Sequence, residues 1–94
     1  MVLSNYDTEE LVVEDVLTKE AEQNTIILFN DDVNTFEWVI ECLMKYCGHD
    51  SLQAEQCAYI VHYTGKCGVK KGSLATLEPI CSALLQKGLS AEIN

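Results

Sequence analysis

A short apolar segment that stops at three polar residues constrains this chain more than any other feature. Residues 26–29 read Ile-Ile-Leu-Phe, a run short and β-prone enough for one buried strand. The polar run 30–32, Asn-Asp-Asp, ends it, and an amphipathic pattern starts shortly afterwards. Asn34 stands where a helix N-cap would stand, and Glu37 three residues later would complete a capping box. The segment predicts a strand and a helix that hold an irregular acidic loop, a natural place for function.

Length and charge limit what such a chain can bind. Its 94 residues suit one small domain, which buries about 60 to 65% of the surface of the unfolded chain, so we expect a shallow pocket. A net charge of -9 opposes binding to nucleic acid and to anionic membranes. The sequence contains neither an apolar run of about 18 residues nor a signal-peptide pattern. We expect a cytoplasmic protein that partners neither nucleic acid nor a membrane.

The cysteines indicate core packing. They are odd in number and lack the C-x-x-C spacing of many zinc sites. Without a secretion signal, reduced thiols that fill the core are expected, with no metal and no cofactor. The five are Cys42, Cys47, Cys57, Cys67 and Cys81.

The N-terminal quarter of the chain differs in composition from the rest. Residues 1–23 carry seven acidic side chains and a single basic one, Lys19. They have too few apolar residues to bury a core, so we expect a flexible acidic extension. Its charge suits either a solubilising tail or a segment that engages a partner, and the composition leaves both open.

Two apolar stripes at helical spacing follow the acidic loop. The first predicts a helix over about 35–47, and Gly48 supplies its left-handed end. The second predicts a helix over about 51–64, which Asp50 opens as N-cap and Gly65 closes. The expected core positions of the two helices are Phe36, Val39, Ile40, Leu43 and Cys47, then Ala54, Cys57, Ala58 and Val61.

A third helix is predicted near the C-terminus, between Ser73 as its cap and Gly88 as its stop. Pro79 is awkward inside it, because a proline removes an intrahelical hydrogen bond and crowds the preceding turn. We therefore expect a loose first turn or a helix that starts near Thr76. Its expected core positions are Leu74, Leu77, Cys81, Leu84 and Leu85.

Two further segments have the character of strands. Residues 66–71 alternate loosely between polar and apolar and carry three lysines, which suits an edge strand. Residues 89–94 alternate with a period of two and predict a last strand. The element order is then β-α-α-β-α-β, a small sheet covered by helices within one domain over residues 24–94.

Two features can carry chemistry: the polar loop 30–32 and His62, which follows Ala58 by four residues on the same helix face. A carboxylate, a carboxamide oxygen and a neutral imidazole nitrogen are all hydrogen-bond acceptors, and together they suit a cationic donor such as an ammonium group. Taken singly, each has a plainer interpretation: the loop as a turn and cap cluster, and the histidine as a surface residue.

Five segments of the chain together match one family pattern in residue type and spacing: Asn30-Asp31-Asp32, Thr35 to Ile40, Ala54-Glu55-Gln56, Val61 to Lys66 and Cys67-Gly68-Val69. Their joint spacing resembles the ClpS adaptor family over residues 24–94. The resemblance implies an α+β domain with a three-stranded, mainly antiparallel sheet packed against helices. It also implies an adaptor rather than an enzyme, which recognises substrates by a bulky N-terminal Leu, Phe, Tyr or Trp, an N-degron, and hands them to a ClpA- or ClpC-type AAA+ unfoldase.

The family pattern, carried over residue by residue, implies two parts of one site. Asn30, Asp31 and His62 are expected to bind the free α-amino group, whereas Asp32 and Asn34 are expected to serve the turn and cap. The pocket for the N-terminal side chain is expected to be lined by Phe36, Val39, Ala58, Val61 and Leu89, with Asn34 at its rim.

This chain departs from the family pattern at two pocket positions. Ala58 stands where methionine is common, which predicts a roomier pocket that favours large aromatic residues and rejects β-branched residues less strictly. Phe36 also replaces a common methionine, and its bulkier ring partly offsets the first change. The connection before Leu89 is shorter than in many relatives, so the alignment of Leu89 with the family's pocket residue depends on how the chain folds there.

Two rival interpretations belong to different functional classes. One is a small hydrolase in which Cys67 acts as the nucleophile with His62 and Asp31, which requires a reactive thiolate within reach of its base. The other is an interaction domain of the same fold that lacks N-degron recognition, because a fold alone does not dictate a site. An adaptor should bind a peptide with a free N-terminus and not the same peptide acetylated there. An interaction domain without N-degron recognition should not distinguish the two peptides.

Overall fold

The computed structural model describes residues 23–94, and the predicted element order β-α-α-β-α-β is confirmed. The extension expected over residues 1–23 lies outside the described residues, apart from Gln23, which opens the first strand. The elements are β1 (Gln23–Phe29), α2 (Phe36–Cys47), α3 (Ser51–Thr64), β2 (Lys66–Ser73), α4 (Leu74–Gln86) and β3 (Ser90–Ile93).

The sheet has β1 at its centre, with β2 and β3 paired antiparallel to its two edges. The predicted three-stranded antiparallel sheet and the lysine-rich edge strand are thus both confirmed. The pairing of β1 with β2 slips by one residue between Ile26 and Ile27, which face Lys70 and Gly68. Val69 is therefore an extra residue on β2 with no partner on β1, a β-bulge.

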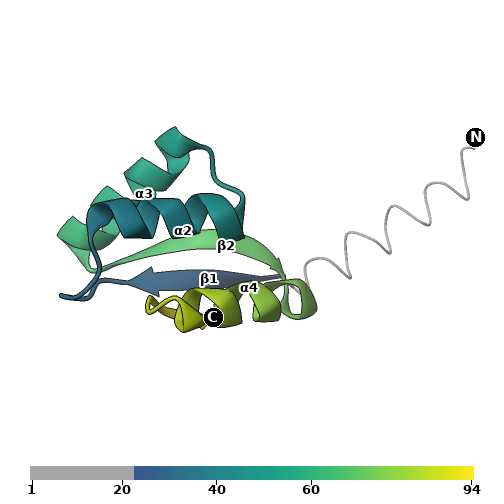
Figure 1. Cartoon of the computed structure of the whole chain (residues 1–94). Coiled ribbons are helices and arrows are strands. Elements are labelled where there is room, and N and C mark those ends of the chain that lie inside the picture. The colour runs from purple at the N-terminus through teal and green to yellow at the C-terminus, as the bar shows by residue number, and fades with distance from the viewer. Residues whose placement is uncertain (1–22) are drawn as a thin grey trace, which may run out of the picture.

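One face of the sheet carries the core. Ile26 and Leu28 alternate along β1 and are fully buried, because successive side chains of a strand point to opposite faces. They join buried residues from all three helices in a single cluster. In Figure 1, α2 and α3 lie next to each other at the top of the view, and α4 lies below them beside β1.

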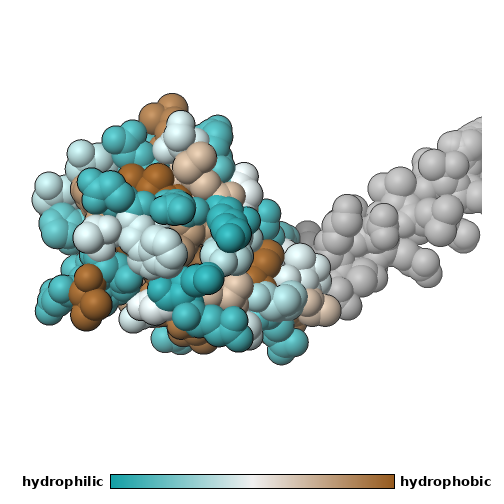
Figure 2. Space-filling model, viewed as in Figure 1, coloured by the Kyte–Doolittle hydropathy of each residue, from teal (hydrophilic) through white to brown (hydrophobic). Residues whose placement is uncertain are grey.

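The outer surface of the domain is mixed in character. Figure 2 shows hydrophobic residues as separate small areas among hydrophilic ones on the face in view. Scattered exposed apolar residues are normal for a small domain, whereas a large continuous patch marks a contact surface. The described residues contain no helix long and apolar enough to cross a membrane.

The ends of α2 and α3 follow the predicted chemistry with one correction. Asp50 caps α3 by accepting a hydrogen bond from the Gln53 backbone, as predicted. The N-cap of α2 is Thr35, whose hydroxyl accepts from the Trp38 backbone. The predicted cap at Asn34 is therefore wrong by one residue, because the Asn34 side chain is engaged elsewhere in the fold.

The glycine stops were predicted correctly. Gly48 and Gly65 both adopt positive φ, 73° and 99°, directly after the last helical residues. Their backbone N–H groups donate to Leu43 and Val61 and so satisfy carbonyls at the helix ends. The sharp stop at Gly65 sends the chain directly from α3 into β2.

Helix α4 differs from its prediction in two ways. Ser73 caps it as expected, but the helix begins at Leu74 and continues through Pro79, so a start near Thr76 is wrong. Pro79 is the sixth residue of the helix, and its missing N–H removes only the hydrogen bond to the Ala75 carbonyl. Ala75 is exposed, so water can donate to this carbonyl instead. Leu74 also proves exposed, at 47%.

The buried stripe of α4 is narrower than its apolar residues suggest. Leu77, Cys81 and Leu84 enter the core as predicted, but Leu85 is 51% exposed. Leu85 and Leu74 are thus wrong as core positions, because the sheet and α2 cover only the central stripe of the helix.

All five cysteines are unpaired, as expected, and four of them are buried. Burial raises the pKa of the Cys47 thiol to about 11 and that of Cys57 to about 12. These thiols are therefore protonated at neutral pH and behave as small apolar side chains. Cys67 is half-buried. Between residues 23 and 94, no three metal-ligating side chains form a group that could hold an ion.

Candidate functional site

A pocket of about 380 Å³ opens where the end of β1, the start of α2 and the end of α3 meet. This volume is near the lower end of the range for small-ligand sites, about 300 to 1,000 Å³, and suits a single amino-acid side chain with its backbone amine. Its lining residues are Leu28, Phe29, Asn30, Asp31, Asp32, Asn34, Thr35, Phe36, Val39, Ala58, Val61, His62, Tyr63 and Leu89.

The structure brings every residue expected at the site into this one lining. Five lining residues were not anticipated as site residues: Leu28, Phe29, Asp32, Thr35 and Tyr63. Each lies within two residues of an expected residue, so closeness in sequence to the Asn-Asp-Asp loop and to His62 was the signal that could have found them. The nine expected residues are Asn30, Asp31, Asn34, Phe36, Val39, Ala58, Val61, His62 and Leu89.

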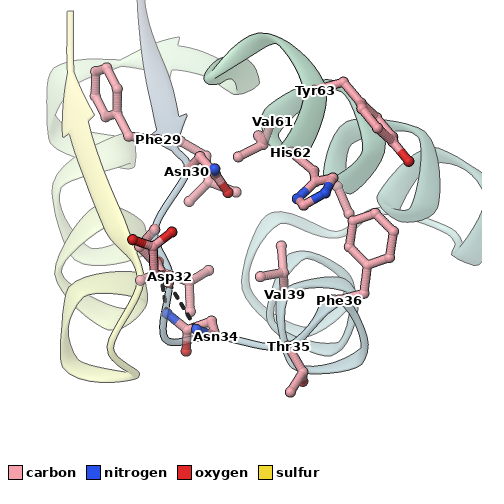
Figure 3. Close-up of a pocket in the computed structure, with 14 residues that line it drawn as sticks. Phe29, Asn30, Asp32, Asn34, Thr35, Phe36, Val39, Val61, His62 and Tyr63 are labelled. Atoms are coloured by element: carbon pink, nitrogen blue, oxygen red, sulfur yellow. Dashed lines mark hydrogen bonds between the residues drawn. The ribbon is translucent and has the colours of Figure 1, made fainter.

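Asn30 and His62 form the two polar sides of the pocket. Figure 3 shows their side chains on opposite sides of the opening, with Val61 above and Val39 below the space that separates them. The Asn30 backbone N–H donates to the Gly65 carbonyl at 3.0 Å, which ties the start of the loop to the end of α3. Two residues 32 positions apart are thus held opposite each other by the β1–α3 contact.

Asp31 organises the loop from within. One carboxylate oxygen accepts from the backbone N–H groups of Val33 and Asn34, both at 2.8 Å, and the other accepts from the Asn34 side-chain amide at 2.8 Å. Partial burial acts to raise the pKa of Asp31, but these hydrogen bonds outweigh it and hold the pKa below its ordinary value. Asp31 is therefore a carboxylate at neutral pH.

These contacts correct the expected roles of the two aspartates in the loop. Asp31, rather than Asp32, is the residue that makes the turn, while Asp32 is exposed at the pocket lining. A carboxylate offers about four lone-pair positions, and the loop takes three of those on Asp31. Asp31 thus retains its negative charge and one acceptor position for a cationic ligand.

The loop is fastened to the turn between α4 and β3. The Asn34 side-chain amide donates to the Gly88 carbonyl at 2.9 Å, and the Trp38 indole N–H donates to the Lys87 carbonyl at 3.0 Å. Gly88 has a positive φ of 91°, which a residue with a side chain rarely adopts. The next residue, Leu89, is buried and lines the pocket, so the short connection does place it in the wall.

The apolar part of the pocket comes from the α2–α3 pair. Ala58 and Val61 are buried on the inner face of α3, and Val39 and Phe36 are half-buried on α2. Because Ala58 ends at its β-carbon, the wall is recessed there. A hydrophobic side chain that enters would meet this wall while its backbone lies near the polar loop.

No cysteine of residues 23–94 lines the pocket. The Cys67 thiol donates to the Gly68 carbonyl at 3.4 Å instead. A thiol nucleophile would have to lie within hydrogen-bond reach of its base in the site where the substrate binds. The geometry therefore does not support the hydrolase built on Cys67 and His62.

Comparisons with known proteins point to one family. The family model described as ATP-dependent Clp protease adaptor protein ClpS matches residues 19–92. ClpS adapter proteins of Salmonella gallinarum and Escherichia coli O127:H6 are 37% and 38% identical to this chain over 73 residues, which cover 73% of it and 69% of each relative.

A solved structure has the same fold. It is Agrobacterium tumefaciens ClpS2 bound to L-phenylalaninamide, with a TM-score of 0.74 at 16% identity, and the likeness covers 78% of this chain and 95% of that one. At this identity the structural likeness concerns the fold alone, whereas the family match spans most of the sequence. The chain belongs to the ClpS family of ATP-dependent Clp protease adaptor proteins.

Proposed function

We propose that this chain is an N-degron adaptor whose pocket binds the N-terminal residue of substrate proteins. In this proposal Asn30, Asp31 and His62 bind the free α-amino group, and the apolar wall takes a side chain such as Leu, Phe, Tyr or Trp. The adaptor then delivers the substrate to the AAA+ unfoldase of the Clp protease, of ClpA or ClpC type. The observation that carries the proposal is the junction of anionic acceptors with an apolar wall in one pocket of about 380 Å³.

The polar side of the pocket suits a cation. An α-amino group has a reference pKa of about 7.7 to 8, so it is largely an ammonium ion at neutral pH. Asp31 supplies a full negative charge because its pKa lies below the ordinary value. Asn30 and His62 add neutral acceptors from opposite sides. Together they match the three N–H donors of an ammonium ion.

The expected affinity is moderate. Burying a Leu or Phe side chain contributes about 1.5 to 3 kcal/mol, and each hydrogen bond to a charged group about 1.5 to 3 kcal/mol. Association costs at least about 4 kcal/mol, so even the upper end of these contributions leaves a dissociation constant no tighter than about micromolar. An adaptor of this affinity can release its substrate to the unfoldase.

The recess at Ala58 bears on the choice of side chain. Ala58 is buried in the pocket wall, and the space beside it suits large aromatic rings. The ligand of the ClpS2 relative, L-phenylalaninamide, is itself a free α-amine with an aromatic side chain. We therefore expect Trp and Phe N-termini to bind more tightly than Leu, and Leu more tightly than Ile.

A pair of peptides tests the proposal. A peptide that begins with Phe should bind in the micromolar range, and the same peptide acetylated at its N-terminus should lose at least tenfold in affinity, because acetylation removes the cation. Calorimetry or fluorescence anisotropy measures both, and peptides beginning with Trp, Leu and Ile give the ranking.

The control is a peptide of the same composition that begins with Gly, which keeps the ammonium group and removes the side chain. Equal binding of the free and acetylated peptides, or binding of neither, would overturn the proposal. The chain would then be an interaction domain of the same fold without N-degron recognition. Delivery is measured separately, as faster degradation of a Phe-first reporter by the Clp protease when the adaptor is added.

A further inference from the structure

Four aromatic side chains form a closed set of contacts at the mouth of the pocket. Phe36, the first residue of α2, meets Tyr59 edge-on, with ring centroids 4.8 Å apart, and meets His62 at 5.5 Å. Tyr63 stacks on Tyr59 at 6.0 Å and meets His62 edge-on at 4.8 Å. Each ring touches two others, so the four lie in a cycle that joins α2 to the last turns of α3.

Tyr59 has a distinct place in this cycle. Phe36, His62 and Tyr63 line the pocket, but Tyr59 does not, so it contacts Phe36 from outside. Figure 3 shows Phe36 and His62 side by side on the α2–α3 side of the opening. Tyr59 is 46% exposed and outside the buried core cluster, so its contribution to the core is small.

We infer that Tyr59 is a positioning residue that holds Phe36 in one rotamer and thereby sets which side chains the pocket prefers. The inference rests on the proposed function and deepens it. A phenylalanine at the rim of a pocket can exchange between staggered χ1 rotamers unless its neighbours select one. Edge-on aromatic pairs attract each other beyond their buried area, and the Phe36–Tyr59 pair at an interplanar angle of 75° has that geometry.

The fixed ring has a consequence for specificity. A Phe36 ring held in one orientation offers a constant surface to an aromatic side chain that enters the pocket. A ring that exchanges between rotamers can also move aside for a branched aliphatic chain. The preference for Phe over Leu N-termini should therefore depend on Tyr59, although Tyr59 lies outside the pocket.

Three variants test this role. Tyr59→Ala removes the ring, Tyr59→Phe keeps it, and Ile60→Ala is the matched control, because Ile60 is the next residue of α3 and is 44% exposed. Tyr59→Ala should lower the ratio of affinities for Phe-first and Leu-first peptides by about threefold, whereas the other two should leave the ratio unchanged. Tyr59→Leu serves as a second variant without a ring, and thermal unfolding verifies that each variant is folded.

A second readout needs no peptide. NMR coupling constants that report the Phe36 χ1 angle should indicate one rotamer in the unsubstituted protein and in Tyr59→Phe, and an average in Tyr59→Ala. An unchanged rotamer in Tyr59→Ala overturns the inference, as does the same change in Ile60→Ala. A changed rotamer with an unchanged affinity ratio overturns the role in specificity.

The two proposals can fail separately. If the unsubstituted protein binds no peptide with a free N-terminus, N-degron recognition fails, and the Phe36 couplings alone decide whether Tyr59 positions the ring. If the free peptide binds and the acetylated one does not, recognition stands, and the affinity ratio decides the specificity role.

Discussion

The two ends of the α2–α3 pair each carry one histidine, and the surroundings of the two side chains differ. His49 lies in the turn between the helices and is only 5% exposed, with its Nε2 2.7 Å from the Val69 carbonyl. His62 lies at the far end of α3, exposed and in the pocket lining. The helix that separates them, α3, has 14 residues and is therefore about 21 Å long, so the two histidines lie near opposite ends of this helix.

The closed end depends on the bulge in β2. Val69 is the extra residue that has no partner on β1, and its carbonyl accepts a hydrogen bond from His49. Because a carbonyl only accepts, this contact assigns an N–H to Nε2, and Nδ1 is left buried without a partner among residues 23–94. His49 therefore satisfies a backbone group that the sheet leaves free, which is a structural role.

The open end has the opposite character. Its polar groups are exposed and point into a space that a ligand can fill, and the loop that holds them is tied down by Asp31 and Asn34. The comparison shows that one layer of two helices has a closed end and an open end. A histidine that the protein has fully surrounded stabilises the fold, whereas one left at the rim is available for a ligand.

Removing the buried side chain of His49 should have the largest effect, a loss of free energy of unfolding. His49→Ala leaves the Val69 carbonyl without its donor and opens a void, and we expect it to lower the free energy of unfolding by about 3 kcal/mol. His62→Ala should change that free energy by no more than about 0.5 kcal/mol, because the side chain is exposed. Urea unfolding measures both, and equal losses would contradict the proposed contrast between the two ends.

Peptide affinity should show the reverse order. His62→Ala removes one acceptor of the ammonium group and should weaken binding of a Phe-first peptide about tenfold or more. His49→Gln is the matched control, because its side-chain amide can still donate to the Val69 carbonyl, and it should bind as the unsubstituted protein does. Calorimetry at neutral pH decides this, and comparable losses in both variants would mean that the pocket end has no special part in binding.

The smallest effect concerns the loop at acid pH. The pKa of Asp31 is lowered in the folded state, so its carboxylate stabilises the fold above its ordinary value of 3.8 and this contribution is lost as the pH falls through the folded pKa. Asp31→Asn should lower the free energy of unfolding by about 1 kcal/mol near pH 7, as for the loss of a helix cap.

The control for this effect is Asp32→Asn, because Asp32 is an exposed neighbour in the same loop. The free energy of unfolding should be measured from pH 7 to pH 3 for Asp31→Asn and the unsubstituted protein. The difference between the two values should shrink as the pH falls. A difference that stays constant over this range, or an equal one for Asp32→Asn, would argue against the charge of Asp31 as the stabilising element.

Local chemistry accounts for the features that could be predicted. The caps at Asp50 and Ser73 and the stops at Gly48 and Gly65 depend on contacts within a few residues, so their sequence neighbours suffice. The buried positions of α3 could likewise be predicted from the helical spacing of its apolar residues. The nine expected site residues came from the family resemblance, and the fold places all of them around one pocket, while their roles in binding stay predictions.

The order of the elements, most helix ends and the polar character of the loop after β1 follow from the local sequence. The contacts that this loop makes depend on the folded arrangement of the chain. Asn34 is drawn away from the cap position because its side chain reaches Gly88, 54 residues further along the chain. Tyr59 of α3 likewise meets Phe36 of α2, 23 residues earlier in the chain. Such contacts join distant segments, and only packing around a shared core brings their partners within reach.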